Sequence, residues 1–502
     1  MTDHGTDRVD LLIVGGGING AGIARDAAGR GLSVLLVEQD DLASHTSSAS
    51  TKLIHGGLRY LEYGEFRLVR EALIERERLL NMAPHIIWPL SFVLPQTRSP
   101  RPAWMVRLGL FLYDHLGGRE KLPGTRTIAL ERSPLGAGLL PREGKAFVYS
   151  DCWVEDSRLV ALNALDAQER GARIETRTRL IDARREGAGW SATVAAEGGT
   201  PRTVQARALV NAAGPWVADV IGRTHGTRRD RGVRLVKGSH IVLPRLYEGD
   251  HAFMLQNDDR RIVFAIPYEG RFTLVGTTDE PWTGAPAKAS ISQAETTYLL
   301  DTANRYFLRK VDPSDVVWSY AGIRPLYDDH AANASAVTRD YVLDLDTGAE
   351  GEAQAPMLNI FGGKITTYRK LAEHAMRELA AFFPAAGPAW TAGATLPGGD
   401  FADADFDRFL ADLTVRHGQV LPALLRRLAR AYGTRVDGIL ASGDLGEDLG
   451  GGLHTAEVDY LVRAEWARTA EDILYRRSKL GLHVPPQTPE RLARYLAEQG
   501  VA

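Results

Sequence analysis

A glycine-rich turn near the start of the chain has the spacing that brings backbone close to a pyrophosphate. Residues 15–20 fit G-x-G-x-x-G, in which Gly15 permits the tight turn, Gly17 admits the phosphates and Gly20 lets the next helix pack closely. Glu38 ends the following apolar segment, where a carboxylate accepts hydrogen bonds from an adenosine ribose. A glycine turn without a ligand would not explain Glu38. The pattern therefore predicts a dinucleotide bound at a helix N-terminus.

Three later segments favour FAD over NAD as that dinucleotide. Residues 44–52 are dense in serine and threonine, which can hydrogen-bond a pyrophosphate and a flavin ring. Residues 208–214 read as a strand that ends in small residues, which lets backbone pass close to a cofactor. Residues 361–367 join a late strand to a helix, whose N-terminus can stabilise the negative charge of a reduced flavin. Each segment is ambiguous alone, but their order along the chain is not what an NAD enzyme needs.

Cationic and imidazole side chains recur beside glycine-rich turns and predict an anionic substrate. A phosphate monoester needs more than one cation, and arginine binds it through two parallel hydrogen bonds. Any one of these side chains could instead be a surface charge or part of a structural ion pair. The candidates are His55, Arg59, Lys237, His240, Arg324, Arg339 and Lys364.

The composition bounds the class of protein. The chain has 502 residues, 44% hydrophobic and 25% charged, which suits a soluble protein of several domains. A formal net charge of -3 argues against a general nucleic-acid-binding surface. Cys152 is the only cysteine, so we expect no intramolecular disulfide, no multi-cysteine metal or iron–sulfur site, and a reducing compartment. We expect neither a signal peptide nor a transmembrane helix.

The hydrophobic pattern predicts an α/β fold. A strand at 9–14, a helix at 19–30 and a strand at 33–38 make one βαβ unit. Residues 233–342 are strand-rich and suit a sheet that roofs a site, and residues 384–400, rich in proline, glycine and alanine, predict a domain boundary. The other expected elements are helices at 66–82 and 158–170, strands at 172–178, 190–195, 203–210 and 357–361, a helix to about 383, and helices through 401–502.

Several longer motifs match one family. They are residues 15–20, 47–50, 52–60, 149–153, 214–216, 237–240 and 361–370, and the match extends into the helical region around 460–479. On these motifs the chain resembles the bacterial FAD-dependent, quinone-linked glycerol-3-phosphate dehydrogenases. The resemblance implies oxidation of sn-glycerol 3-phosphate to dihydroxyacetone phosphate in glycerol catabolism, with hydride transfer to FAD N5 and electron transfer to ubiquinone or menaquinone. It also implies a homodimer, attached peripherally to the cytoplasmic face of the membrane.

The resemblance completes the expected organisation. It is an FAD-binding, Rossmann-like fold with an antiparallel-sheet substrate domain and an all-helical C-terminal domain. The expected ranges are an oxidoreductase region at 1–385 and a helical domain at 386–502. Within the former, the FAD-binding fold is expected near 8–60, 145–232 and 355–383, and the substrate-binding part near 61–144 and 233–354.

Roles carry over by motif, residue by residue. His55, Arg324 and Lys364 are expected around the reacting C2 hydroxyl as catalytic residues. The substrate-binding candidates are Arg59, Tyr60, His240 and Arg339. Non-covalent FAD is expected to contact Gly15, Gly17, Gly20, Glu38, Thr46, Ser47, Ser48, Lys52, Leu53, Gly57, Gly214, Trp216, Gly363, Thr366 and Thr367.

The sequence leaves some choices open. His55 is the first choice for the base, because imidazole titrates near neutral pH. Lys364 would serve if desolvation lowers its pKa; otherwise it and Arg324 stabilise developing charge. A peroxide-forming glycerol-3-phosphate oxidase would use the same site with oxygen as acceptor, and a membrane-associated FAD-binding scaffold without turnover is the more distant reading.

Residues 102–118 predict a surface helix at a membrane. The segment is apolar with Trp104 and Tyr113 near its ends, is interrupted by Arg107, and is too short to span a bilayer. Between residues 98 and 132 there are seven Arg or Lys residues against three Asp or Glu residues. This local positive charge would attract an anionic leaflet. An ordinary core helix with a basic flank is the alternative.

Overall fold

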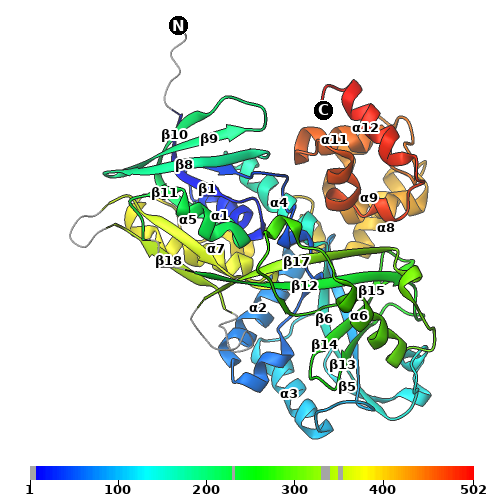
Figure 1. Cartoon of the computed structure of the whole chain (residues 1–502). Helices are drawn as coiled ribbons and strands as arrows, with labels where there is room; N and C mark the ends of the chain where they lie inside the picture. The colour runs from blue at the N-terminus through cyan, green and yellow to red at the C-terminus, as the bar shows by residue number, and fades with distance from the viewer. Residues whose placement is uncertain (1–6, 229–231, 329–339, 349–353, 502) are drawn as a thin grey trace.

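The computed structural model describes residues 7–228, 232–328, 340–348 and 354–501 (Figure 1). Its first sheet has a parallel centre, in which β1 pairs with β2 on one side and β10 on the other. β7 extends the sheet beside β2, and β19 extends it beside β10. These strands are β1 (Asp7–Val14), β2 (Val34–Val37), β7 (Arg173–Glu175), β10 (Arg202–Asn211) and β19 (Met357–Phe361).

Antiparallel strands, with the short parallel strand β11, complete the first sheet. β8 and β9 form a meander that pairs with the first half of β10, β11 lies beside β8, and β18 pairs with β19. Their bounds are β8 (Thr178–Glu186), β9 (Gly189–Ala196), β11 (Thr224–His225) and β18 (Val342–Asp346). The sequence predicted β9 and β10 closely, but it merged the end of β7 with the start of β8.

Both faces of the first sheet are covered because its buried strands are apolar on both sides. Along β1, Leu11 and Ile13 face one core while Leu12 and Val14 face the other. The first core holds α1 (Ile18–Gly29), α4 (Asp156–Glu169) and α7 (Tyr368–Glu378). The second holds α5 (Val217–Gly222) and the meander. The predicted βαβ unit is β1–α1–β2.

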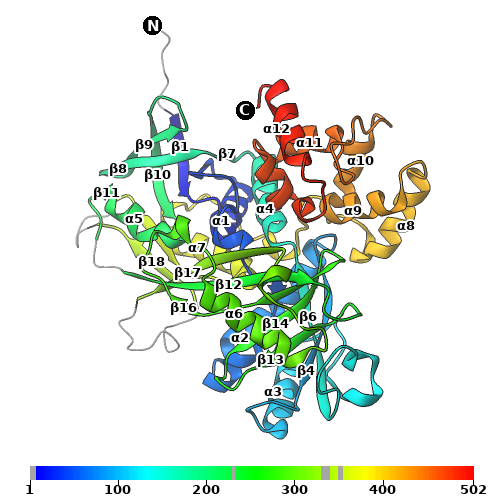
Figure 2. The same ribbon diagram turned by 45° about the vertical axis from the view of Figure 1, so that its right-hand side comes forward.

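The second sheet is mainly antiparallel and lies beside the first (Figure 2). Its spatial order is β16-β12-β15-β14-β13-β4-β6-β3, with β17 beside β12 and β5 beside β6. The bounds are β3 (Leu53–Ile54), β4 (Ile87–Pro95), β5 (Arg126–Ala129), β6 (Lys145–Val154), β12 (Val233–Pro244), β13 (Ala252–Gln256), β14 (Ile262–Tyr268), β15 (Phe272–Gly276), β16 (Glu280–Pro281) and β17 (Trp318–Tyr327).

Helices pack on both faces of the second sheet. α6 (Gln293–Tyr306) covers one face, and α2 (Phe66–Met82) and α3 (Ala103–Leu116) contribute to the core on the other. α2 has the predicted bounds. Residues 145–154 were expected in the dinucleotide-binding fold, but as β6 they pair with β4, β5 and β3 of the second sheet.

The C-terminal region is helical and has its own core. Its helices are α8 (Phe406–Arg416), α9 (Pro422–Tyr432), α10 (Val436–Leu440), α11 (Thr455–Glu465) and α12 (Thr488–Glu498). Buried ion pairs attach it to the loop after β2 and to α4: Arg477 donates to both carboxylate oxygens of Asp41, at 2.7 and 2.8 Å, and Arg158 of α4 pairs with Glu465. Such pairs fix the docking orientation, because breaking one leaves an uncompensated buried charge.

Candidate active site

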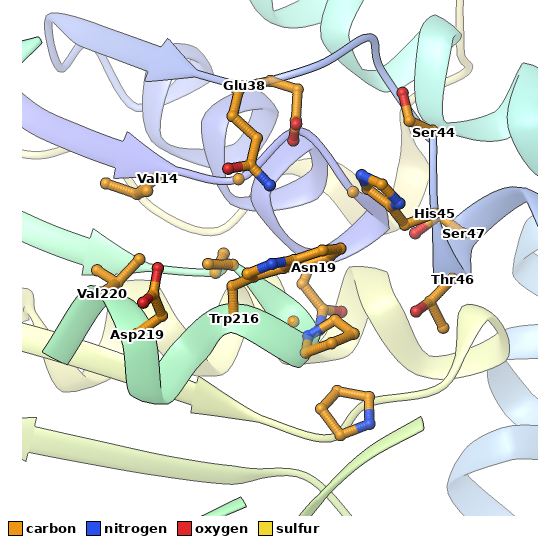
Figure 3. Close-up of a pocket in the computed structure, with 18 of the residues that line it drawn as sticks. Val14, Asn19, Glu38, Ser44, His45, Thr46, Ser47, Trp216, Asp219 and Val220 are labelled. Carbon is orange, nitrogen blue, oxygen red and sulfur yellow. The ribbon is translucent and has the colours of Figure 1, made fainter. Parts of the chain in front are cut away.

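Two adjoining cavities lie where the strands of the first sheet end. The turn cavity is bounded by the glycine turn, β2 and its following loop, and residues 212–216 (Figure 3). Figure 3 shows Glu38, His45 and Trp216 around it. The central cavity, of about 560 Å³, lies between the turn and the second sheet. Thr46, Ser47 and Gly363 line both, so the two form one continuous elongated site.

The glycines of the turn do different work. A Cβ at Gly15 would lie 2.5 Å from the carbonyl oxygen of Ala212, and one at Gly20 would lie 1.9 Å from that of Gly15. These two glycines let backbone segments touch, as the motif predicts. A Cβ at Gly17 would meet only Ser47 Oγ, at 3.0 Å, so its position is open toward the cavity at the start of α1.

Glu38 reaches back to the turn. Its carboxylate accepts hydrogen bonds from the backbone N–H of Gly16 at 2.6 Å and of Asp40 at 2.9 Å. Burial raises the pKa of Glu38, and these two hydrogen bonds oppose the rise. The side chain therefore stands at the cavity wall with its position fixed, at the carboxyl end of β2.

The loop at 44–53 is closed by a buried ion pair. Lys52, whose side chain is fully buried, donates to both carboxylate oxygens of Asp156 at 2.9 Å and to the carbonyl oxygen of Ser48 at 3.0 Å. Ser47 faces the cavity instead, and its hydroxyl accepts the N–H of Ile18 at 3.0 Å. Lys52 thus braces the loop from behind.

Charged and imidazole side chains gather in the central cavity. Its lining includes Leu53, His55, Gly57, Arg59, Tyr60, His240, Arg324, Lys364 and Thr366 from the predicted set. They come from the loop after β3, from β12 and β17, and from the segment after β19. Residues more than 300 positions apart thus share one wall, as the anionic-substrate prediction requires.

His55 is half-buried on this wall. Burial lowers its pKa, the Asp151 carboxylate raises it, and the Lys364 and Arg76 cations lower it; the net change is downward. A lowered pKa leaves the imidazole neutral near pH 7 and able to accept a proton. The backbone N–H of His55 donates to Thr366 Oγ1 at 3.2 Å, which ties the segment to the one after β19.

His240 is more enclosed. Its ring stacks on Tyr320 with the centroids 4.8 Å apart, and its Nε2 lies 3.0 Å from Thr51 Oγ1. Burial, together with the nearby cations Lys52 and Arg324, holds its pKa well below the usual range. The ring is therefore neutral, and Nδ1 has no hydrogen-bond partner among the described residues.

The cations differ in how firmly they are held. Arg324 pairs with Asp279 and donates to Thr277 Oγ1 at 3.2 Å. Lys364 Nζ lies 3.8 Å from the ring centroid of Tyr60, a cation–π contact. Arg59 donates to the Tyr63 hydroxyl at 3.3 Å, while its buried Nε has no partner among the described residues.

Some predicted residues do not line these two cavities. Lys52 braces the loop, Gly20 packs inside the turn, Ser48 lines a neighbouring cavity at the C-terminal region, and Thr367 is buried at the end of the short helix at 365–367. Lys237 pairs with Glu295 of α6 at 2.8 Å, because alternation along β12 turns it away from the cavity that Gly238 and His240 face. Arg339 lies outside the described residues.

Sequence reasoning missed several lining residues. His45, from the predicted serine- and threonine-rich loop, lies 4.5 Å from Trp216 between ring centroids. Asp151 stands in a motif that matched the family but received no role. Thr277 and Asp279 follow β15, where only the pairing of the second sheet brings them to Arg324.

Comparison with known proteins places this site in a family. A family model described as FAD-dependent oxidoreductase matches residues 10–369. The chain belongs to the FAD-dependent oxidoreductases. A second model, the C-terminal domain of alpha-glycerophosphate oxidase, matches residues 389–498. FAD is therefore the cofactor, and the expected combination of FAD-binding fold, second sheet and helical C-terminal region is confirmed.

Relatives cover nearly the whole chain. A D-erythritol 1-phosphate dehydrogenase from Brucella abortus is 56% identical over 95% of this chain and 95% of its own length. A glycerol-3-phosphate dehydrogenase from Pseudomonas aeruginosa is 56% identical over 98% of this chain and 95% of its own. The glycerol-3-phosphate dehydrogenase from Bacillus halodurans, solved with FAD, superposes with a TM-score of 0.75 at 27% identity, covering 98% and 90% of the two chains.

The cavities fit FAD. Gly17 leaves open space at the start of α1, where a helix N-terminus binds pyrophosphate. Asn19 donates from Nδ2 to the carbonyl oxygen of Gly362 at 3.0 Å, and its buried Oδ1 has no partner among the described residues where the two cavities meet. Cys152 is fully buried in β6, and burial raises its thiol pKa, so this thiol is not presented to a flavin.

Proposed function

We propose that this flavoenzyme oxidises sn-glycerol 3-phosphate to dihydroxyacetone phosphate. The observation that carries the proposal is the meeting of His55, Arg324 and Lys364 in one cavity that continues into the dinucleotide turn. Oxidation of a secondary alcohol needs a proton acceptor and a hydride acceptor side by side, and a phosphorylated alcohol needs cations as well. The relative named glycerol-3-phosphate dehydrogenase at 56% identity supports the assignment.

In this reaction, bound FAD supplies the hydride acceptor at N5. Neutral His55 accepts the proton of the C2 hydroxyl. Arg324 and Lys364 stabilise the negative charge that develops on the C2 oxygen. Arg59, Tyr60, His240 and Arg339 are proposed to hold the substrate. Arg59 lines the central cavity, and its buried Nε has no hydrogen-bond partner among the described residues.

Turnover of purified holoenzyme with a dye acceptor tests the substrate. Glycerol 3-phosphate is expected to be oxidised with a kcat/KM at least about tenfold above that of glycerol, since one charge-assisted hydrogen bond contributes ~1.5–3 kcal/mol. Equal activity on the two alcohols would contradict a phosphate site.

D-erythritol 1-phosphate is the second candidate substrate, because the relative named for it is also 56% identical. It has one carbon more than glycerol 3-phosphate. Measuring kcat/KM for both phosphates in the same assay decides between them; a value more than about tenfold higher for the four-carbon substrate, equivalent to ~1.4 kcal/mol, would replace the first assignment.

We further propose a membrane quinone as electron acceptor. Anaerobic re-oxidation of the reduced flavin by a short-chain ubiquinone or menaquinone analogue is expected to be much faster than re-oxidation by oxygen. Formation of one peroxide per substrate oxidised in air, together with slow quinone reduction, would favour the oxidase alternative. The C-terminal family model is named after such an oxidase.

A membrane quinone requires attachment to the lipid surface, and we assign this to α3, at the cytoplasmic face. None of the described helices is long and apolar enough to cross a membrane. Trp104, Leu108 and Phe111 of α3 expose 70%, 52% and 50% of their surface, while Leu110 and Tyr113 are buried. An amphipathic helix of this kind lies in the interface plane. A homodimer is proposed from the family resemblance, and sedimentation in detergent tests it.

A further inference from the structure

Asp151 is a buried carboxylate at the floor of the central cavity that the proposed reaction has not used. It lies on β6, opposite Leu90 of β4, in the motif 149–153. It is only 2% exposed, yet it lines the cavity that holds His55. Placing an ionised carboxylate in such a position costs free energy unless it is hydrogen-bonded and paired.

Two partners hold this carboxylate. The Tyr113 hydroxyl lies 2.7 and 2.9 Å from its two oxygens. Arg76 donates from one nitrogen to Asp151 Oδ1 at 2.7 Å and to the carbonyl oxygen of Ser150 at 2.9 Å. Tyr113 comes from α3 and Arg76 from α2, so both helices that pack on this face of the sheet fix the carboxylate.

The same network reaches the backbone beside His55. The N–H of Gly56 donates to the Tyr113 oxygen at 2.7 Å, while the N–H of His55 donates to Thr366. A Cβ at Gly56 would lie 2.7 Å from the Tyr113 ring, so the two segments are in close contact. The backbone next to His55 is therefore linked to Asp151 through one shared hydroxyl.

The charges that face the imidazole come from three elements. They are Asp151 on β6, Arg76 on α2, and Lys364 in the segment after β19. Asp151 is the negative one, and it favours the protonated ring, whereas the two cations and burial disfavour it. When His55 gains a proton during turnover, Asp151 is placed to compensate the new positive charge.

We propose that Asp151 is the positioning residue of His55: held by Tyr113 and Arg76, it fixes the imidazole and stabilises the imidazolium formed during substrate oxidation. This inference rests on the proposed function. In the step, the O–H bond of the substrate breaks and an N–H bond forms on His55, while hydride leaves C2 for FAD and the proton later passes to solvent.

Two variants separate this role from a merely structural one. Asp151→Asn removes the negative charge, so the pKa of His55 should fall by about one unit or more, the size expected for two charges within ~12 Å of each other at an effective dielectric near 20. Tyr113→Phe keeps the charges of Asp151 and Arg76 but removes the hydroxyl that hydrogen-bonds the carboxylate. The negative charge of Asp151 then acts more strongly on the imidazole, so the pKa of His55 should rise. Both variants should slow flavin reduction at pH 7.5 by about tenfold or more.

The control is Tyr268→Phe. Tyr268 is a buried tyrosine of the same hydrophobic cluster, does not line the central cavity, and its hydroxyl has no hydrogen-bond partner among the described residues. It should leave the pKa of His55 and the rate unchanged. FAD content, measured by absorbance, checks the fold of every variant. Asp151→Asn leaves Arg76 without its main partner. If Asp151→Asn does not fold, Tyr113→Phe alone tests the proposal.

The measurement is an NMR titration of the holoenzyme with ¹³C-labelled histidine, in which the His55 resonance is assigned by its loss in His55→Gln. The pH dependence of flavin reduction by glycerol 3-phosphate is recorded beside it. Opposite shifts of the His55 pKa in the two variants, matched by the acid limb of the rate profile, support the proposal. A slower rate with an unmoved pKa overturns it. Since the titration needs no substrate, failure of the proposed function would appear separately, as wild-type flavin that glycerol 3-phosphate does not reduce.

Discussion

The exposed face of α3 permits a membrane test that leaves the fold intact. Changing Trp104, Leu108 and Phe111 to serine removes the apolar surface that faces outward. The buried face of the helix, with Val106, Leu110 and Tyr113, is untouched. Substitutions at exposed positions usually change stability by less than about 0.5 kcal/mol. The variant should therefore retain FAD and reduce a water-soluble dye at the wild-type rate.

The size of the effect follows from the exposed surface. A tryptophan carries about 200 Å² of accessible surface, so 70% exposure of Trp104 corresponds to ~3.5 kcal/mol of transfer free energy at ~25 cal/mol/Å². Leu108 and Phe111, each about half exposed, add ~1 kcal/mol apiece. An interfacial helix buries about half of this surface, so the loss is ~2–3 kcal/mol, a roughly hundredfold weaker partitioning.

Flotation with liposomes that contain anionic lipid measures this loss. Wild-type protein should float with the vesicles, less so at high salt, which screens the basic flank. The matched control changes Val415 and Leu421, exposed by 87% and 73% in the C-terminal region, to serine, and it should float like wild type. If the α3 variant folds and still floats, α3 is not the attachment site.

Three other predictions concern the cofactor, the cations and pH. Gly17→Ala should weaken FAD binding in a protein that still folds. Gly20→Ala should instead lower the yield of folded protein, because its Cβ would overlap a backbone oxygen. Flavin absorbance gives the FAD content and circular dichroism gives the folded fraction, so the two measurements together distinguish the two effects. Arg59→Ala should mainly raise KM for glycerol 3-phosphate and Arg324→Ala should mainly lower kcat; the reverse would exchange their roles. The pKa of Glu295 is lowered to about 2 by hydrogen bonds that outweigh burial, so its contribution of ~3 kcal/mol is present above pH ~4.5 and is lost as the pH falls toward 2. In Glu295→Gln, the free energy of unfolding measured in urea should therefore change less with pH between about 2 and 4.5 than in the wild type. An equally steep pH dependence in the variant would contradict this prediction.

Local patterns were enough to predict the elements that carry the cofactor. The turn at 15–20, its helix and the strands on either side follow from glycine spacing and apolar runs, which act within about 30 residues. The bounds of α2 follow equally from helical spacing of its apolar positions. Residues 145–154 were placed in the wrong sheet because an apolar strand does not encode its pairing partner, and β4, its neighbour, lies about 50 residues earlier.

The site was predictable in its residue types more than in its contacts. Lysines beside glycine turns cannot be told apart from the sequence. In the structure, Lys364 faces the cavity, whereas Lys52 and Lys237 form ion pairs with buried carboxylates. The partners of those two lysines, Asp156 and Glu295, lie about 100 and 60 residues away, so spacing alone gave no sign of them. Asp151 was missed for the same reason: its importance rests on Tyr113 and Arg76, which only the packing of two helices brings together.

Anaerobic mixing of the purified holoenzyme with glycerol 3-phosphate, followed by flavin absorbance, tests the central claim most directly. The oxidised band should bleach in a single turnover without any added acceptor, and His55→Ala should slow that bleaching at pH 7.5 while keeping its FAD. A flavin that stays oxidised in the wild-type protein, with FAD fully bound and substrate in excess, would contradict the account.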